Sequence, residues 1–436
     1  MSSKIKGLTL FESIAIVSGI VIGAGFFKTP SIVAQSCSDM VSLILVWVFG
    51  GIISLFGALC YAELSSTYPG QGGDYHFLFR AYGLKTAFLF AWARLMVIQT
   101  GSIAMLGFII GDYASEIFKL GDFSSSIYAT LIILLFTMTN ILGLRVSSTV
   151  QKFLFLIVIC GLLYVAFSGF FLSPGVSSVI NVQGNNVWGK AMIFVLLTYG
   201  GWNEAAFLSA EIKDGRKNII RVFIFSIAII TFIYLIMNLA FVHGMGFMGL
   251  RNSTAAAADL MRDVSGNTGA SIISFLVVLA SMGTLNAVIF TGARSTYILG
   301  SDFTIFRYIY KWEEKRGQPV RALILQAFIA LLLVIAGTSS RDGFVLMVEY
   351  TAPVFWLFLF LTGVSLFILR KKDYSFQRPF KTPFYPMTPL LFCFFSLFML
   401  SSSVLHSGKG ALAGLLVLVI GLPFLWIRKS QSVLPE

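Results

Sequence analysis

The sequence has few charged residues and few of the side chains that metal sites need. Only 11% of its 436 residues are charged, whereas a soluble domain has about 25%. Its three histidines lie far apart in the chain, so no histidine cluster predicts a metal site or a proton relay. The cysteines show no paired spacing, which argues against a disulfide framework or a cysteine-rich metal centre. They are Cys37, Cys60, Cys160 and Cys393. We therefore expect no cofactor and no metal.

The chain also lacks the arrangements that are typical of enzymes. No nucleophile–base pair and no glycine-rich phosphate loop stands between its apolar stretches. The first apolar stretch has no small-residue cleavage site and is followed at once by others, so we interpret it as a retained helix. We expect neither catalytic residues nor a separate soluble domain.

Long apolar stretches are what the sequence has in abundance, with 57% hydrophobic residues and a mean hydropathy of +0.88. A helix needs about 20 apolar residues to cross a bilayer, and such stretches recur throughout the chain. They predict an all-α membrane protein with twelve transmembrane helices. The expected spans are 8–35, 41–66, 84–116, 127–145, 150–173, 188–211, 219–244, 268–299, 321–338, 343–371, 386–405 and 409–428.

The net charge of +12 is distributed in alternate loops, which argues against a nucleic-acid-binding protein. Cytoplasmic loops carry an excess of lysine and arginine, so this alternation sets the orientation. We expect an even number of helices, both termini in the cytoplasm and a multi-pass protein of the cell (inner) membrane.

Two of the spans are interrupted by short glycine-containing segments. The first is Ile22-Gly23-Ala24-Gly25-Phe26, and the second is Thr198-Tyr199-Gly200-Gly201-Trp202-Asn203. Lipid offers no hydrogen-bond partners, so an unwound backbone must find them in protein, water or a ligand. Paired breaks in corresponding spans indicate a transporter site near the bilayer midplane.

The exposed ends of broken helices suit a ligand that carries both charges. Amides at a helix N-terminus favour an anion such as a carboxylate, whereas carbonyls at a helix C-terminus favour a cation. An α-amino acid satisfies both. Close helix packing is the alternative role for the glycines.

These segments, with others in the same order, resemble those of the amino acid–polyamine–organocation superfamily. The similarity is greatest to its L-type and serine/threonine-exchanger-like amino acid transporters. Besides the breaks, four further segments carry the resemblance. They are Tyr61-Ala62-Glu63-Leu64 with Gly72-Gly73-Asp74-Tyr75, Glu211 to Gly215, Gly283-Thr284-Leu285-Asn286 with Arg294, and Arg378-Pro379-Phe380 to Tyr385-Pro386.

The resemblance implies a leucine-transporter-like fold with a five-plus-five inverted repeat, in which helices 1 and 6 are broken. The chain 1–436 would form one integral-membrane domain, with repeats at about 8–173 and 188–371 and the last two helices at 386–428. The α-carboxylate would meet the amides around Gly23, and the α-ammonium the carbonyls near Val21. The expected substrate-binding residues are Val21, Ile22, Gly23, Ala24, Gly25, Phe26, Leu197, Thr198, Tyr199, Gly200, Gly201, Trp202, Asn203 and Glu204.

Two positions depart from the family pattern and leave the coupling ion open. The middle residue of the first break is Ala24 instead of serine, and Val158 stands where many relatives have a lysine. The candidates for ion coupling are Ser281, Lys28 and Glu204, and the choice among Na⁺, H⁺ and plain exchange stays open. Glu204 is equally consistent with a structural ion pair.

We expect a secondary transporter, a permease or antiporter, that moves amino acids across the membrane by alternating access. The alternatives are a transporter of polyamines or other amines, a channel, and a sensor that binds an amino acid without moving it. Animal L-type relatives join a heavy subunit through a cysteine between helices 3 and 4. Residues 112–126 contain no cysteine, so we expect no disulfide-linked heavy subunit.

Overall fold

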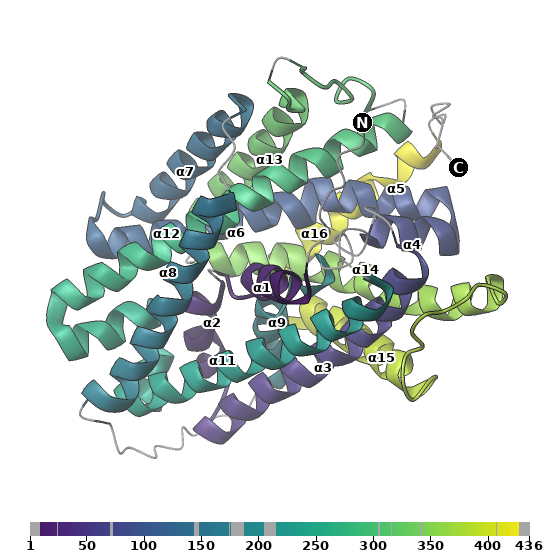
Figure 1. Cartoon of the computed structure of the whole chain (residues 1–436). Helices are drawn as coiled ribbons and strands as arrows, with labels where there is room; N and C mark the ends of the chain where they lie inside the picture. Colours follow the sequence, from purple (N-terminus) through teal and green to yellow (C-terminus); the bar gives the residue numbers. More distant parts are fainter. Residues whose placement is uncertain are drawn as a thin grey trace. The chain divides into compact units, whose positions relative to one another are not determined.

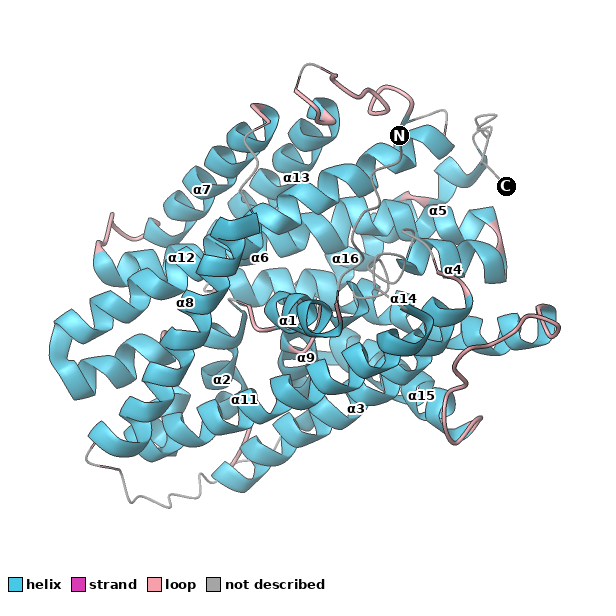
Figure 2. Ribbon diagram, viewed as in Figure 1, coloured by secondary structure: helices cyan, strands magenta, loops and turns pink. Residues whose placement is uncertain are grey.

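The structure, a computed structural model, describes most of the chain. The described residues are 9–23, 25–69, 73–143, 148–173, 175, 187–204, 215–303, 306–314, 316–340, 342–406 and 408–426. Within these ranges every named element is a helix, and one isolated bridge pairs Glu313 with Gln318 (Figures 1 and 2). The expected all-α class is confirmed for this part of the chain.

The α-helices follow one another along the chain. They are α1 (Leu10–Val21), α2 (Gly25–Gln35), α3 (Met40–Thr67), α4 (Gly73–Tyr82), α5 (Leu84–Ala93), α6 (Gln99–Ile117), α7 (Ser124–Ile141), α8 (Ser148–Phe167), α9 (Trp188–Thr198), α11 (Gly215–Asn252), α12 (Ala256–Asp302), α13 (Val320–Thr338), α14 (Gly343–Lys372), α15 (Met387–His406) and α16 (Gly408–Ile420). Shorter helical segments are η1 (Arg94–Ile98), η2 (Ser168–Leu172), η3 (Trp202–Glu204) and η5 (Leu422–Trp426).

In the described residues, nine helices are long and apolar enough to cross a membrane, and they fall in the second to fourth and the seventh to twelfth expected spans. The first, fifth and sixth expected spans contain shorter apolar helices, and α1 and α9 end at the predicted breaks. The total of twelve transmembrane helices stays a prediction. Glycines also end the regular parts of two long helices, since Gly246 in α11 and Gly266 in α12 have φ values of 75° and 68°.

The chain divides into two compact units. Unit 1 consists of Met1–Ala87, Ile180–Leu239 and Trp356–Ser402, and unit 2 of Phe88–Val179, Ala240–Phe355 and Ser403–Glu436. Both breaks therefore belong to unit 1. The inverted repeat predicted from the sequence stays a prediction.

Polar side chains fasten the helices of unit 2 to one another. Gln99 of α6 and Gln326 of α13 donate to the backbone carbonyls of Val288 and Ile289 in α12, both at 2.7 Å. The Asn140 amide donates to the Asn286 side chain at 2.7 Å. In an apolar surrounding such bonds fix which helix faces meet, because an unsatisfied amide there is costly.

Close contact between α3 and α9 in unit 1 depends on Gly50. A Cβ atom at this position would lie 2.4 Å from Val195 Cγ1 and 3.0 Å from the Tyr199 ring. We expect Gly50→Ala to lower the free energy of unfolding by about 1–3 kcal/mol, the usual cost of overpacking. The control is Gly161→Ala, whose Cβ would meet its nearest atoms at 3.8 Å. Thermal unfolding of the two purified variants tests this, and equal effects would contradict it.

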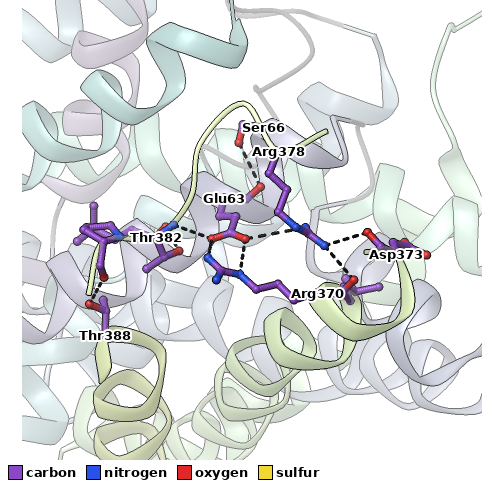
Figure 3. Close-up of polar contacts among 10 residues, drawn as sticks. Glu63, Ser66, Arg370, Asp373, Arg378, Thr382 and Thr388 are labelled. Carbon is purple, nitrogen blue, oxygen red and sulfur yellow. Dashed lines mark hydrogen bonds and ion pairs between the residues drawn. The ribbon is translucent and has the colours of Figure 1, made fainter. Parts of the chain in front are cut away.

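A buried carboxylate, Glu63, joins α3 to the end of α14 and to the segment that follows it (Figure 3). Its side chain is fully buried and accepts bonds from Arg370 Nε at 2.7 Å and Arg370 Nη2 at 2.5 Å. The Thr382 backbone N–H donates to it at 2.7 Å, and Arg378 Nη1 lies 3.9 Å away. Two arginines thus compensate one buried acid.

Asp373 forms the outer part of the same cluster. Its carboxylate accepts bonds from the Tyr68 hydroxyl at 2.9 Å and from Arg80 Nε at 3.1 Å. Arg80 also covers the rings of Tyr68 and Phe376, with its Cζ 4.6 Å and 5.1 Å from the centroids. The segment after α14 is therefore held in place at two acidic residues.

The partners of Asp373 predict a stability that depends on pH. Burial alone would raise the pKa of this carboxyl, but the bonds from Tyr68 and Arg80 outweigh it and hold the pKa below its ordinary value of 3.8. Folding therefore favours the charged carboxylate. The contribution of this carboxylate to stability is complete at pH values above its ordinary pKa and is lost as the pH falls through the lowered pKa. We expect Asp373→Asn to flatten the acid limb of a plot of unfolding temperature against pH. An unchanged acid limb would contradict this assignment.

Candidate functional site

The first break separates α1 from α2. After Val21 the Ile22 N–H still donates to the Ser18 carbonyl at 2.7 Å, and the Gly23 N–H turns back to the Val21 carbonyl at 2.7 Å. Helix α2 starts at Gly25 with no acidic residue in its first turn. A Cβ atom on Gly25 would meet nothing within 4 Å, so this helix N-terminus faces open space. The Phe26 N–H donates to the Gly23 carbonyl at 3.3 Å, and a helix N-terminus of this kind carries partial positive charge that suits an anion.

The second break follows α9. The Gly200 N–H donates to the Leu197 carbonyl at 3.0 Å, and Gly201 takes a φ of 103° before η3 begins at Trp202. Glycine is required at both positions. A Cβ on Gly200 would lie 2.7 Å from the Leu197 oxygen, and side chains rarely adopt the backbone conformation of Gly201.

The predicted binding residues fall into two groups by exposure. Seven are buried, namely Val21, Ile22, Phe26, Thr198, Tyr199, Trp202 and Asn203. Five are partly exposed, namely Gly23, Gly25, Leu197, Gly200 and Gly201. Ala24 and the side chain of Glu204 lie outside the described residues. The accessible positions are thus the glycines themselves and one leucine, where a ligand would meet mainly backbone.

A hydroxyl from α11 connects the two breaks directly. Tyr234 Oη lies 2.9 Å from the Val21 carbonyl oxygen and 3.1 Å from that of Thr198, within hydrogen-bond distance of both. These carbonyls are at the C-termini of α1 and α9, where the helix dipoles are negative. The Val21 carbonyl also accepts the Gly23 N–H, so the single hydroxyl proton of Tyr234 is shared between that carbonyl and the Thr198 carbonyl.

Tyr234 was not among the residues predicted from the sequence, although a signal was present. The residue stands within the apolar span 219–244, where a buried hydroxyl needs a hydrogen-bond partner. Only the fold shows that the partners are the two breaks. The structure therefore adds Tyr234 to the candidate site.

Four fully buried aromatic rings, including that of Tyr234, pack together at this hydroxyl. Phe26 stacks on Tyr234 with ring centroids 4.4 Å apart, and Trp47 packs edge-on against both. Tyr199 lies 5.1 Å from Tyr234 between ring centroids and donates its hydroxyl to the Trp47 carbonyl at 3.1 Å. Phe26 and Tyr199, both among the expected substrate-binding residues, belong to this cluster. Their part in substrate selection stays a prediction.

A second tie joins α2 to α9 through two threonine hydroxyls. Thr198 Oγ1 lies 2.8 Å from Thr29 Oγ1, which donates to the Gly25 carbonyl at 2.7 Å. Both hydroxyls are buried. The helix that begins at the first break is thus bonded by side chains to the helix that ends at the second.

We expect the Thr29–Thr198 pair to position the two breaks for substrate. Thr29→Val and Thr198→Val should each weaken amino acid binding. The double variant should lose less binding free energy than the sum of the two single losses, by about 0.5–1.5 kcal/mol. Binding titrations of the four proteins give this coupling energy. Strictly additive losses would show that the hydroxyl pair does not act as a unit.

The candidates for ion coupling are only partly described. Ser281 is fully buried and donates its hydroxyl to the Val277 carbonyl of its own helix at 2.6 Å. Lys28 is 7% exposed on α2, and Val158, the expected lysine position, is buried on α8. The ion-coupling roles of Ser281, Lys28 and Glu204 stay predictions.

Comparison with known proteins identifies the family. The family model described as "Amino acid permease" matches residues 8–423. The chain belongs to the amino acid permease family. This confirms the superfamily expected from the breaks and from the segments around Glu63 and Arg378.

The permease is similar over most of its length to several animal transporters. It is 28% identical to the human b(0,+)-type amino acid transporter 1 over 422 residues, which cover 92% of this chain and 83% of that protein. It is 25% identical to the human cystine/glutamate transporter, with coverages of 98% and 87%. Identity to the mouse large neutral amino acids transporter small subunit 2 is 27%, with coverages of 96% and 80%.

Proposed function

We propose that the permease is a secondary transporter that moves amino acids across a membrane by alternating access. The observation that carries this proposal is the Tyr234 hydroxyl, which lies within hydrogen-bond distance of a carbonyl of each break. Two separate helix ends thereby form one polar site inside an apolar unit. The family match over residues 8–423 and relatives named as amino acid transporters support the same function.

The charges of the site fit an α-amino acid. The N-terminus of α2 faces open space at Gly25 and carries partial positive charge, which suits a carboxylate. The carbonyls of Val21 and Thr198 lie at helix C-termini and bring partial negative charge, which suits an ammonium group. We propose that the substrate carboxylate binds at Gly23–Gly25 and that its ammonium joins Tyr234 at the two carbonyls.

Glu204 and Leu197 complete the proposed site. Leu197 is the partly exposed apolar side chain at the second break and is our candidate for contact with the substrate side chain. Glu204 follows Asn203 in η3 and is the acid nearest to the breaks in sequence. Since one acid is little compensation for a cationic side chain, we propose neutral amino acids as the preferred substrates.

The proposed architecture is that of the superfamily. Twelve transmembrane helices would include five-plus-five inverted repeats at about 8–173 and 188–371, with both termini in the cytoplasm. We propose a bacterial inner membrane as the location. We also expect the permease to work without a disulfide-linked heavy subunit and without a metal. Transport assays can distinguish coupling to Na⁺, coupling to H⁺ and plain exchange.

Competition binding tests the carboxylate part of the proposal. A neutral amino acid should displace a bound radiolabelled amino acid, whereas the corresponding amine without its carboxyl group should compete at least tenfold more weakly, the effect of about 1.4 kcal/mol. An amine that competes equally well would favour the alternative, a transporter of polyamines or other amines. The matched control is the methyl ester, which keeps the ammonium and the side chain but not the anionic charge.

A further inference from the structure

The segment between α14 and α15, residues 373–386, combines fixed backbone with exposed aromatic rings. Tyr374 and Phe384 are each 85% exposed, and Phe376 and Tyr385 are 47% and 41% exposed. Candidate membrane spans precede and follow this segment directly, ending at Lys372 and beginning at Met387. The aromatic rings therefore lie beside two spans, where the membrane–water interface is expected.

Phe384 is the clearest sign that the rings face something outside the protein. Its φ is 54°, a left-handed conformation that costs a non-glycine residue about 1–2 kcal/mol. Its carbonyl accepts the N–H groups of Met387 and Thr388 at 2.7 Å and 3.3 Å, so the backbone conformation serves the turn into α15. The side chain itself is 85% exposed, and an exposed apolar ring of this size suits an external apolar surface.

The exposed charges of the same segment and its flank are all positive. Lys371, Lys372 and Lys381 are exposed, and the Lys372 ammonium donates to the Arg80 carbonyl at 2.9 Å. The two acids of this region are fully buried or 15% exposed, and Figure 3 shows arginines around them. Both acids of the cluster are thus paired with arginines, and the exposed lysines add positive charge at the outer surface.

The cluster around Glu63 makes this surface preformed. The Thr382 N–H and the Arg370 guanidinium share one carboxylate, and Arg370 Cζ lies 3.6 Å from the centroid of the Tyr385 ring. Arg378 donates to the carbonyls of Leu369 and Asp373 at 3.0 Å and 3.2 Å. A binding surface that is already ordered loses little conformational entropy when it is occupied.

We propose that this segment is a docking surface for anionic phospholipid headgroups, with Lys371, Lys372 and Lys381 contacting the phosphates and Tyr374 and Phe384 inserted at the acyl boundary. Aromatic residues anchor proteins at the level of the headgroups, and each lysine near an anionic bilayer contributes to binding. The proposal concerns lipid alone and is independent of which substrate the permease carries.

Lipid titration of the full-length protein, followed by native mass spectrometry, tests the proposal. We expect phosphatidylglycerol to bind the wild type roughly 100-fold more tightly than K371Q/K372Q/K381Q at low salt, with the difference nearly lost at high salt. The control is K119Q/K311Q/K409Q, which removes three exposed lysines elsewhere and should bind like the wild type. Phe384→Ser should weaken binding while keeping its salt dependence.

Three results would each overturn the proposal. They are equal losses of affinity in the two triple variants, binding of phosphatidylcholine as tight as that of phosphatidylglycerol, and displacement of the lipid by inorganic phosphate. The last outcome would assign the lysines to a small free anion instead. Amino acid binding, measured in the same variants, shows that these variants are folded. Loss of amino acid binding in the wild type and in every variant would count against the proposed function and not against the lipid surface.

Discussion

Glu63→Ala should destabilise the protein severely, lowering its free energy of unfolding by about 3–5 kcal/mol. The carboxylate is fully buried and compensates Arg370 and Arg378, whose side chains are 17% and 8% exposed. Without it, the Arg370 guanidinium and the Thr382 N–H lose their acceptor, and Arg378 loses a compensating charge. Chemical unfolding of the purified variant measures the change.

The control for this prediction is an acid in a more exposed ion pair. Glu116 lies 2.5 Å from Arg262 and is 27% exposed, so Glu116→Gln should cost less than about 1 kcal/mol. Similar losses in the Glu63 and Glu116 variants would contradict the view that burial of the Glu63 carboxylate is what makes it important.

Tyr234→Phe should weaken amino acid binding by about tenfold to a hundredfold and change stability much less. The substitution removes only the oxygen within reach of the Val21 and Thr198 carbonyls, and the ring can still stack on Phe26. Losing a buried hydrogen-bond partner costs about 1–3 kcal/mol, and here we expect the loss to fall on the ligand. Equilibrium binding of a radiolabelled amino acid measures it.

A matched variant separates this role from general packing. Tyr82 donates its hydroxyl to the Leu361 carbonyl at 2.8 Å, away from both breaks. We expect Tyr82→Phe to leave binding unchanged. If Tyr234→Phe also binds normally, or more tightly, the hydroxyl is a structural tie and the proposed ammonium site is wrong.

The helices and the breaks were predictable because single-residue properties determine them. Apolar stretches of spanning length predict helices in lipid, since no other open structure satisfies the backbone there. Glycine marks the second break because a Cβ at Gly200 would lie 2.7 Å from the Leu197 oxygen and Gly201 has a φ of 103°. The nine helices of spanning length and the ends of α1 and α9 at the breaks agree with these expectations in the part of the chain that the structure describes.

The contacts that make the site were not predictable in the same way. Tyr234 stands far from both breaks in sequence, and its role depends on which face of α11 meets α1 and α9. The partners of the buried Glu63, Arg370 and Thr382, lie 307 and 319 residues further along the chain. Such pairs follow from the packing of helices, which periodicity does not specify in uniformly apolar spans.

Uptake into proteoliposomes tests the central claim most directly. The purified permease is reconstituted, and a panel of radiolabelled neutral amino acids is supplied with and without Na⁺, a pH gradient or an internal amino acid. We predict accumulation of at least one amino acid well beyond the amount of protein present, and strong reduction of that uptake by Tyr234→Phe. Uptake that never exceeds stoichiometric binding under any of these conditions would contradict a transporter and favour a sensor.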